Sequence, residues 1–357
     1  MTAQKSRAVS TRKSFPLPLD KIIIGDCLSV LARLPAGCVD LIVADPPYNI
    51  GYKYDRYDDS QKHEDYCAWT EQWMLMCKRV LSASGSMYVA IGDDYAAELR
   101  IIGRQIGLTL RNWIVWYYTF GQNTKKKFAR SHVHIFYFVA DSGKFTFNDD
   151  SVRVLSDRQK QYADKRANPA GKLPDDTWVV FPRVCGTFAE RAEGPNQLPE
   201  ALVARIIRAS SNPGDLVLDP FCGAGTSAAV AAQLGRHYIS VDISPEYVRK
   251  ARSRIANTLK QTAKYRLDGL SPLQLTVLVR LYQENEIPAA RLLEKPHFIR
   301  IFAEQLNRRL AKCSKASAYA PLNSTHIESA LRRLASKNLL PVLRTDPPSL
   351  RTRQRLV

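Results

Sequence analysis

The chain has 357 residues, and 52 Lys and Arg against 34 Asp and Glu give it a formal net charge of +18. Hydrophobic residues make up 45% of the sequence, the composition of a folded protein rather than a disordered one. The sequence holds no run near the roughly 20 consecutive apolar residues of a membrane-spanning helix, which excludes an integral membrane protein. The length predicts about two domains.

The seven cysteines are scattered and form no Cys-x-x-Cys pair. We therefore expect no metal site, no disulfide scaffold and a reducing, cytoplasmic environment. The excess of positive charge is typical of proteins that bind a polyanion such as nucleic acid. A surface charged only for solubility is the alternative.

In chain order, residues 1–19 are polar and basic and predict a disordered arm. From residue 20, apolar runs alternate with amphipathic stretches, which predicts an α/β domain around a mostly parallel sheet. Strands are expected at residues 22–24, 39–44, 86–91, 113–118, 134–139, 216–218 and 238–241, and helices at residues 28–34, 66–81, 95–106, 198–210 and 227–234.

Residues 141–193 interrupt this alternation with a long polar segment, which predicts a functional insertion. Beyond about residue 260 the strand pattern stops. Residues 261–357 carry 17 Lys and Arg against 7 Asp and Glu, or +10 of the +18. Three helices are expected there, at residues 271–285, 291–310 and 323–339. The last of them, with residues 339–343, weakly resembles a winged-helix recognition helix and strand; packing against the catalytic domain or a second subunit is the alternative.

The first motif with a chemical meaning is Asp45-Pro46-Pro47-Tyr48, directly after the predicted strand 39–44. A carboxylate at the carboxyl end of such a strand lies where open α/β sheets bind ligands. The prolines stiffen the turn and present carbonyl groups as acceptors, and the tyrosine offers a face for stacking. These groups suit a planar exocyclic amine; a proline-stiffened turn without function is the alternative.

The second motif covers residues 219–226, Asp-Pro-Phe-Cys-Gly-Ala-Gly-Thr, after the predicted strand 216–218. Gly223 and Gly225 allow the backbone to approach a ligand before a helix that begins near Thr226. Asp242 ends the next strand, where it can accept hydrogen bonds from ribose hydroxyl groups. The glycine spacing also fits a dinucleotide-binding fold, so an NAD-dependent oxidoreductase and a ligand-free turn remain alternatives.

Together the two motifs resemble those of the amino-DNA methyltransferases, which methylate adenine N6 or cytosine N4 with S-adenosylmethionine (AdoMet). The catalytic motif precedes the cofactor loop, an order similar to the β group, which includes cell-cycle-regulated and restriction–modification adenine methyltransferases. The resemblance covers roughly residues 20–258. It implies a Rossmann-like AdoMet-dependent methyltransferase sheet with a target-recognition insertion at about 141–193, followed by a small helical basic C-terminal domain.

The resemblance also implies roles for individual residues. Asp45 and the Pro46 carbonyl would accept the two amine hydrogens, next to Pro47, and Tyr48 would stack on the flipped base. Phe221 would pack against the cofactor and Asp242 would bind its ribose. The cofactor-binding residues implied are Asp26, Cys27, Asp219, Pro220, Phe221, Gly223, Gly225, Thr226 and Asp242.

Two segments depart from the family pattern. Gly194 and Leu198 lie in a turn where the family usually has His-Pro-x-Gln-Lys-Pro, and His132 and His134 fall where it often has His-Glu. We therefore assign neither histidine a catalytic role. The expected DNA contacts, with solvated surface as the alternative, are Lys125, Lys126, Lys127, Arg130, Arg153, Arg158, Lys165 and Arg166.

We thus expect a site-specific methyltransferase of double-stranded DNA. Adenine N6 is favoured over cytosine N4 because the family's cytosine enzymes more often carry Ser where this chain has Asp45. The alternatives from other classes are an NAD-dependent oxidoreductase and a non-catalytic nucleic-acid-binding protein. A cognate restriction endonuclease is a candidate partner, the chain is expected to be a monomer or homodimer, and its expected location is the bacterial cytoplasm.

Overall fold

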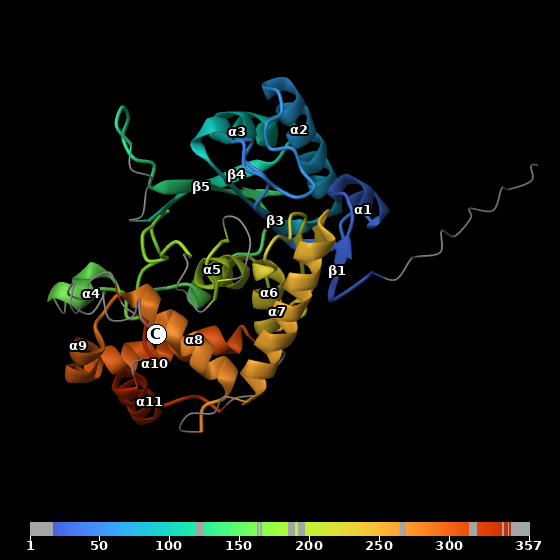
Figure 1. The fold of residues 1–357 in the computed structure, drawn as a ribbon. Coiled ribbons are helices and arrows are strands. Elements are labelled where there is room, and N and C mark those ends of the chain that lie inside the picture. Colours follow the sequence, from blue (N-terminus) through green and yellow to red (C-terminus); the bar gives the residue numbers. More distant parts are fainter. Residues whose placement is uncertain are drawn as a thin grey trace, which may run out of the picture.

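A computed structural model describes residues 17–118, 124–162, 164, 166–184, 190–191, 197–264, 269–313, 320–337, 339–341 and 343. Its centre is an eight-stranded sheet with the order β1-β8-β7-β2-β3-β5-β4-β6 (Figure 1). The strands are β1 (Lys21–Ile24), β2 (Val39–Ala44), β3 (Leu81–Ile91), β4 (Thr109–Tyr117), β5 (His132–Val139), β6 (Thr177–Trp178), β7 (Leu216–Asp219) and β8 (His237–Asp242). Most of the predicted arm lies outside the described residues.

The sheet is mostly parallel, as predicted. Strands β1, β8, β7, β2 and β3 run in one direction, β5 is antiparallel to β3 and β4, and β6 joins β4 in parallel. The strands that precede the two motifs are direct neighbours, because Leu41 pairs with Val217 and Ile42 with Leu218. The pairing of β2 with β7 therefore places segments from distant parts of the sequence at one edge.

The helices cover both faces of the sheet. They are α1 (Cys27–Arg33), α2 (His63–Val80), α3 (Ala96–Gln105), α4 (Asp157–Tyr162), α5 (Glu200–Ser210), α6 (Thr226–Gln233), α7 (Pro245–Lys264), α8 (Pro272–Asn285), α9 (Ala289–Glu294), α10 (Pro296–Ala311) and α11 (Ser324–Ser336). Side chains alternate along a strand, so Ile42 packs with α1, α2 and α3, whereas Leu41 and Val43 belong to the core on the other face, with α5 and α6 (Figure 1). Among the described residues, no helix combines the length and apolar character needed to cross a membrane.

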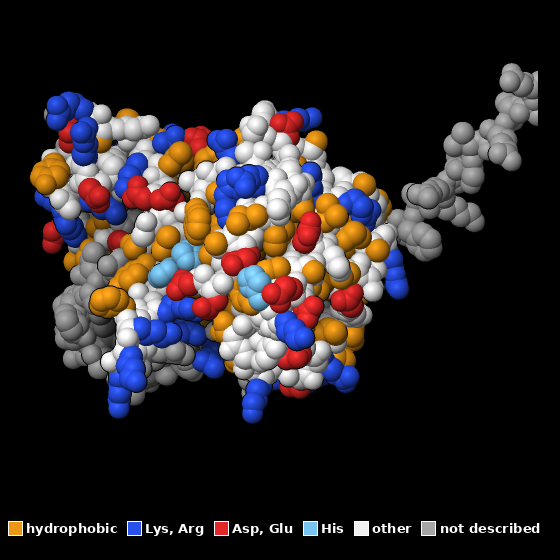
Figure 2. Space-filling view, turned by 90° about the horizontal axis from the view of Figure 1, so that it is seen from above, with side chains coloured by type: hydrophobic (Ala, Val, Ile, Leu, Met, Phe, Trp, Pro, Cys, Tyr) orange, Lys and Arg blue, Asp and Glu red, His pale blue; other side chains and the backbone are white. Residues whose placement is uncertain are grey.

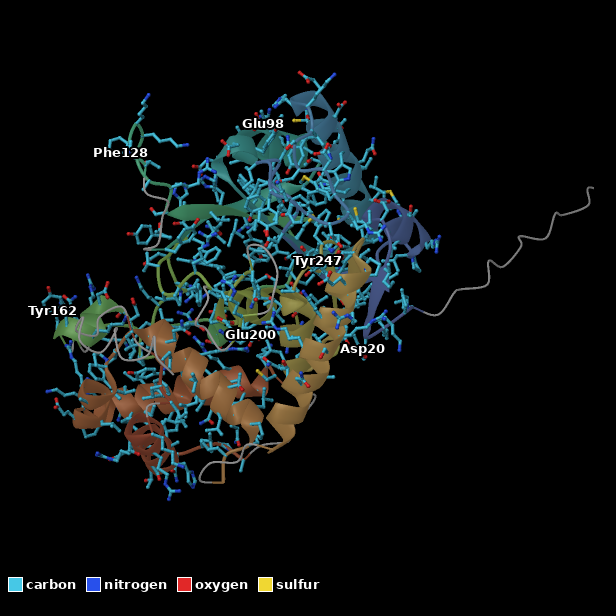
Figure 3. All side chains as sticks on the ribbon, viewed as in Figure 1. Asp20, Glu98, Phe128, Tyr162, Glu200 and Tyr247 are labelled. Carbon is cyan, nitrogen blue, oxygen red and sulfur yellow. The ribbon has the colours of Figure 1, made fainter. Side chains whose placement is uncertain are left out.

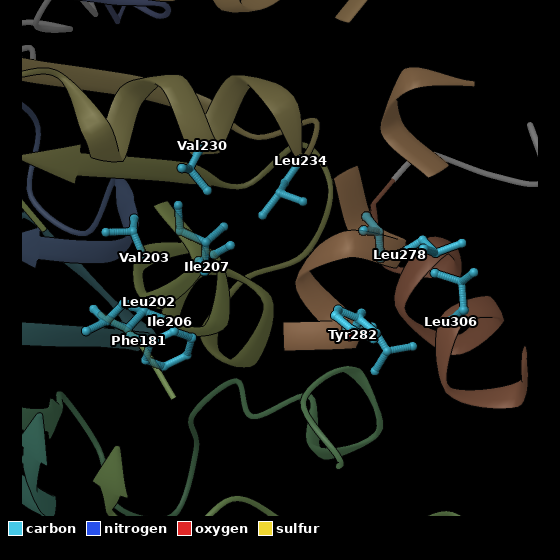
Figure 4. Close-up of a cluster of buried hydrophobic side chains, with 14 of the residues drawn as sticks. Phe181, Leu202, Val203, Ile206, Ile207, Val230, Leu234, Leu278, Tyr282 and Leu306 are labelled. Carbon is cyan, nitrogen blue, oxygen red and sulfur yellow. The ribbon is translucent and has the colours of Figure 1, made fainter. Parts of the chain in front are cut away.

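The C-terminal helices continue the core beneath α5. Ile207 of α5, Leu234 next to α6, Leu278 of α8 and Leu306 of α10 belong to one buried cluster (Figure 4). Helix α7 runs through the expected domain boundary near residue 260. The single helix expected over residues 291–310 is wrong: Pro296 cannot continue a helix, so α9 ends before it and α10 begins at it. Residues 339–341 and 343 form no strand.

A buried carboxylate ties α8 and α10 to α5, the helix that packs on the sheet. Glu284 of α8 accepts hydrogen bonds from Arg205 (3.0 Å) and Arg208 (2.7 Å) of α5 and from Arg309 (2.8 Å) of α10. Burial by itself would raise the pKa of Glu284, but Arg309, Arg205 and Arg208 outweigh it and hold the pKa well below its usual range. Removing one partner from such a cluster leaves uncompensated buried charge.

We predict that Glu284→Gln lowers the free energy of unfolding at pH 7 by about 3 kcal/mol, measured by urea unfolding. The loss is full above the pKa of an unfolded Glu, about 4.3, and shrinks as the pH falls below it, because the native pKa is depressed. Glu328→Gln, which removes the partner of Arg332 in an exposed i,i+4 pair of α11, is the control and costs about 0.5 kcal/mol or less. Equal losses in the two variants would contradict the prediction.

Candidate active site

One cleft lies at the carboxyl ends of the parallel strands β1, β2, β7 and β8, where open α/β sheets bind ligands. It has a volume of about 1140 Å³, counted to its open mouth. Tyr247, near the beginning of α7, lies on its wall (Figure 3). Every predicted catalytic and cofactor residue except Gly225 lines this cleft: Asp26, Cys27, Asp45, Pro46, Pro47, Tyr48, Asp219, Pro220, Phe221, Gly223, Thr226 and Asp242.

The catalytic motif forms a compact hydrogen-bonded turn. Tyr48 Oη donates to Asp45 Oδ1 at 2.7 Å. Burial raises the pKa of Asp45 to about 7; Asp219 adds to the rise and the bond from Tyr48 opposes it. The Pro47 carbonyl accepts from Tyr66 Oη at 2.6 Å, whereas no donor to the Pro46 carbonyl is found in the described part of the chain. Asp45 and the Pro46 carbonyl are therefore the acceptors that can face a ligand.

The second motif is held in shape by two carboxylates. Asp242 accepts from the backbone N–H groups of Gly223 at 2.7 Å and Ser244 at 2.8 Å. Asp219 accepts from the N–H of Phe221 at 3.0 Å, and burial raises the pKa of Asp219 to about 7. Since a carboxylate has about four lone-pair sites, Asp242 can accept further bonds from a ligand in the cleft.

Asp26 and Phe221 are also positioned by specific contacts. Asp26 caps α1 by accepting from the N–H of Ser29 at 3.0 Å. The ring of Phe221 lies 5.6 Å from that of Trp69 and 5.2 Å from that of Trp73, both on α2. These contacts hold an apolar ring on the cleft wall.

Gly225, the remaining predicted cofactor residue, lies between two cleft-lining residues, Ala224 and Thr226, and packs against α7. It has φ +75°, and a Cβ placed on it would lie 2.7 Å from the Cβ of Ala251. Glycine is therefore required here for the left-handed backbone and for the close approach of a helix.

Sequence reasoning missed a loop, residues 49–61, that forms part of the cleft wall through Tyr54, Asp55 and Tyr57. Its buried Asp59 accepts from the backbone N–H groups of Asn49 (2.8 Å), Ile50 (3.1 Å) and Tyr52 (2.9 Å). Ser244 Oγ donates to Asp55 Oδ2 at 2.6 Å, which links this loop to the segment after β8. The missed residues on the cleft wall are Tyr54, Asp55, Tyr57, Trp69, Ser227, Ile243 and Tyr247. The closely spaced tyrosines after the Asp45–Tyr48 motif were the sequence feature that could have indicated this part of the cleft wall.

The loop between β4 and β5 carries exposed positive charge. Lys125, Lys126 and Lys127 are exposed, and the neighbouring Phe128 is 100% exposed. Arg130, by contrast, has its guanidinium 2.9 Å from Asp93 and 3.0 Å from Asp94. Figure 2 shows that basic side chains project from this face at separate points rather than as one continuous patch.

The basic residues of the insertion differ in the same way. Arg158 is exposed, but Arg153 pairs with Asp149 at 2.6 Å and Arg166 pairs with Asp164 at 3.0 Å. Lys165 lies outside the described residues. The insertion also packs on the C-terminal helices, since the N–H of Leu155 donates to Asn285 of α8 at 2.7 Å. Part of its charge therefore serves internal contacts.

Asp93, His132 and His134 lie close enough to resemble a metal-binding cluster. However, Trp113 Nε1 donates to His134 Nδ1 at 2.9 Å, so the ring proton of a neutral His134 is on Nε2, where it bonds Asp93 Oδ1 at 3.0 Å. Burial lowers the pKa of His134, which favours this neutral form. The nitrogen that faces the cluster is thus a donor, and Arg130 already compensates Asp93. The chemistry fits a hydrogen-bonded cluster better than a metal site.

We predict that Gly225→Ala lowers the free energy of unfolding by about 2 kcal/mol, because the new Cβ meets Ala251 and the left-handed backbone disfavours a side chain. Gly37→Ala is the matched control, since Gly37 has φ +67° with nothing within 4 Å of its added Cβ. It is expected to lose only the backbone cost of about 1 kcal/mol. Equal losses in urea unfolding would show that the contact with α7 adds nothing.

Comparisons with known proteins agree with this geometry. The model of the N6/N4 DNA methylase family matches residues 39–253. The chain is 37% identical over 236 residues to the Type II methyltransferase M.HpaI of Haemophilus parainfluenzae, covering 66% of this chain and 74% of the relative. It is 39% identical over 242 residues to the DNA adenine methyltransferase YhdJ of Escherichia coli K12, covering 66% and 82%.

A solved structure supports the fold independently. The PvuII DNA methyltransferase, described as cytosine-N4-specific, is 18% identical with a TM-score of 0.53, covering 74% of this chain and 92% of that one. At this identity the likeness shows the fold alone, and it confirms the predicted Rossmann-like methyltransferase sheet. With the family match over more than half of its length, the chain belongs to the N6/N4 DNA methylase family.

Proposed function

We propose that this chain is a site-specific DNA methyltransferase that transfers a methyl group from AdoMet to the N6 amine of adenine. The observation that carries the proposal is the meeting of the Asp45–Tyr48 turn and the residue 219–226 loop in one cleft, at the ends of the paired strands β2 and β7. A relative at 39% identity is named a DNA adenine methyltransferase. Cytosine N4 is the second candidate, because a cytosine-N4-specific enzyme shares the fold.

The cleft has the chemistry that AdoMet needs. Asp242 and Asp26 offer carboxylates to hydroxyl and amine groups, Phe221 and Ile243 offer apolar surface, and the Gly223 turn allows close backbone approach. When bound, AdoMet supplies an electrophilic methyl group on a sulfonium. We assign the remaining cofactor contacts to Cys27, Asp219, Pro220 and Thr226, and we assign Gly225 an indirect role through α7.

The turn at Asp45 would activate the target amine. The lone pair of an exocyclic amine is delocalised into the base, so the nitrogen is a weak nucleophile. An ionised Asp45 accepts one N–H and the Pro46 carbonyl accepts the other, which favours a tetrahedral nitrogen with a free lone pair. The Tyr48 hydroxyl orients the Asp45 carboxylate, and its ring is available for stacking on a flipped base. With a pKa near 7, Asp45 is also basic enough to take the proton that the nitrogen loses.

The charge of the chain and its relatives support a proposal for its DNA contacts, its partner and its location. Residues 141–193 and the exposed Lys125–Lys127 would contact duplex DNA. The name of the relative M.HpaI as a Type II methyltransferase supports a cognate restriction endonuclease as a partner. A DNA substrate and bacterial relatives are consistent with work in the bacterial cytoplasm, as a monomer or homodimer.

The proposal is tested by methyl transfer from labelled AdoMet to duplex DNA, followed by digestion and identification of the modified nucleoside by mass. Detection of N6-methyladenine supports the proposal. Detection of N4-methylcytosine would change the target base to cytosine but would leave the proposed role of the cleft unchanged. Asp45→Asn is the matched control for transfer at this site. Incorporation that persists in that variant would overturn the role of Asp45.

We predict that kcat/KM rises with pH through about 7 and levels off above it, because the ionised Asp45 is the stronger acceptor for the amine N–H and only this form can take up the amine proton. Asp45→Asn removes this titration and lowers kcat about 100-fold or more, while AdoMet affinity stays near that of the unmodified chain. A flat profile from about pH 6 to 8 would contradict a pKa raised by burial.

We also predict that two basic residues of the β4–β5 loop differ in DNA binding. In Lys126→Gln, the association constant for DNA should fall less steeply with salt: the slope of log K against log salt becomes less negative by about 1. The reason is that each phosphate contact releases counterions. Arg130→Gln leaves that slope unchanged, because Asp93 and Asp94 already neutralise its guanidinium. Equal reductions in fluorescence-anisotropy titrations of duplex DNA would show that Arg130 contacts a phosphate.

A further inference from the structure

The C-terminal helices lie beyond the family match, which ends at residue 253. Their positive charge suggests contact with DNA, but one of their arginines is directed inward. The side chain of Arg280 on α8 is 7% exposed and lies within the core of the molecule rather than on its surface. Its contacts lead, through two intermediate side chains, to the loop that lines the cleft.

The first link is between α7 and the loop. Arg254 Nη1 donates to the carbonyl of Ala224 at 3.1 Å and to Thr226 Oγ1 at 3.0 Å, and both residues line the cleft. Ala251, one turn earlier on α7, lies against Gly225. Residues three apart share one face of a helix, so a single face of α7 supports this loop from behind.

The second link is Glu200, the first residue of α5. Its Oε1 accepts from Arg254 Nη2 at 2.8 Å, and its Oε2 accepts from Arg280 Nη2 at 3.2 Å. Glu200 thus holds Arg254 in the orientation that reaches the loop. The three side chains are only 7–20% exposed, so water screens their attraction weakly.

Arg280 reaches the same loop by a second route. Its Nη2 also donates to Gln233 Oε1 at 2.8 Å. Gln233 is the last residue of α6, and α6 begins at Thr226, directly after the glycine turn. Arg280 therefore contacts the C-terminal end of α6, whose N-terminus follows the loop, and it also contacts Glu200, which orients Arg254.

We propose that Arg280, Glu200 and Arg254 are positioning residues through which helix α8 holds the AdoMet loop in its binding conformation. The inference deepens the proposed function and rests on it. A preorganised loop loses less conformational freedom when a ligand binds, so the helices beyond the family match contribute to cofactor affinity. Contact between Arg280 and DNA is not available in this arrangement, because the side chain is buried.

The test uses the full chain and point substitutions, because removing the C-terminal helices would expose the apolar side of α5. We expect Arg280→Gln to raise the AdoMet Kd about fivefold in calorimetric titration, the scale of coupling between contacting groups. With AdoMet saturating, kcat should change less than the Kd does. Arg280→Lys should recover part of the affinity, since it keeps the charge but not the fork of donors.

Coupling and stability are separated by further variants. Glu200→Gln, close in shape to the original, should also raise the Kd. The double variant with Arg280→Gln should raise the Kd by less than the product of the two single effects, because the two residues share the link through Glu200. Arg332→Gln, which loses an exposed pair within α11, should leave the Kd unchanged. Leu334→Ala, a buried core change in α11, should lower Tm without changing the Kd.

The outcomes distinguish this inference from the proposed function. If the unmodified chain binds no AdoMet, the proposed function fails. If it binds AdoMet and Arg280→Gln binds equally tightly, only the positioning role fails. A second result would also overturn the positioning role. If Leu334→Ala and Arg280→Gln lose the same Tm and raise the AdoMet Kd equally, general destabilisation explains the effect.

Discussion

The parallel pairing of β2 with β7 is the contact on which the site depends. It places Asp45 and Asp219, which follow or end these strands, at one edge of the sheet. Asp219 is buried and Asp45 is partly buried there, and burial raises the pKa of each to about 7. The same pairing that assembles the cleft therefore also changes the acid–base behaviour of the groups inside it.

The cleft is shaped by carboxylates that serve the backbone. Asp242 accepts from the N–H of Gly223 in the glycine turn, Asp26 caps a helix, and Asp59 organises the loop that follows the Asp45–Tyr48 turn. Each fixes a turn whose conformation a ligand would otherwise have to select. The polar groups of the site are thus largely set in place by the fold before any substrate arrives, as electrostatic preorganisation requires.

The positive charge of the chain has two uses. Lys125–Lys127 are exposed and suit phosphate groups, whereas Arg205, Arg208 and Arg309 surround the buried Glu284. Arg280 and Arg254 meet at Glu200 in the same way. Net charge by itself therefore overstates the positive surface available to DNA. The internal arginines instead connect the C-terminal helices to the layer that carries the loop of residues 219–226.

The sequence by itself determined the alternating strands and helices, the two motifs and the family, because these depend on local patterns along the chain. Only the tertiary structure decided that Gly225 faces α7, that Arg130 is neutralised by Asp93 and Asp94, and that the loop of residues 49–61 lines the cleft. It also decided that Arg280 acts inward rather than toward solvent. These properties depend on contacts between residues that are far apart in the sequence. Burial and ion pairing change the charge state of a side chain only when folding brings those residues together.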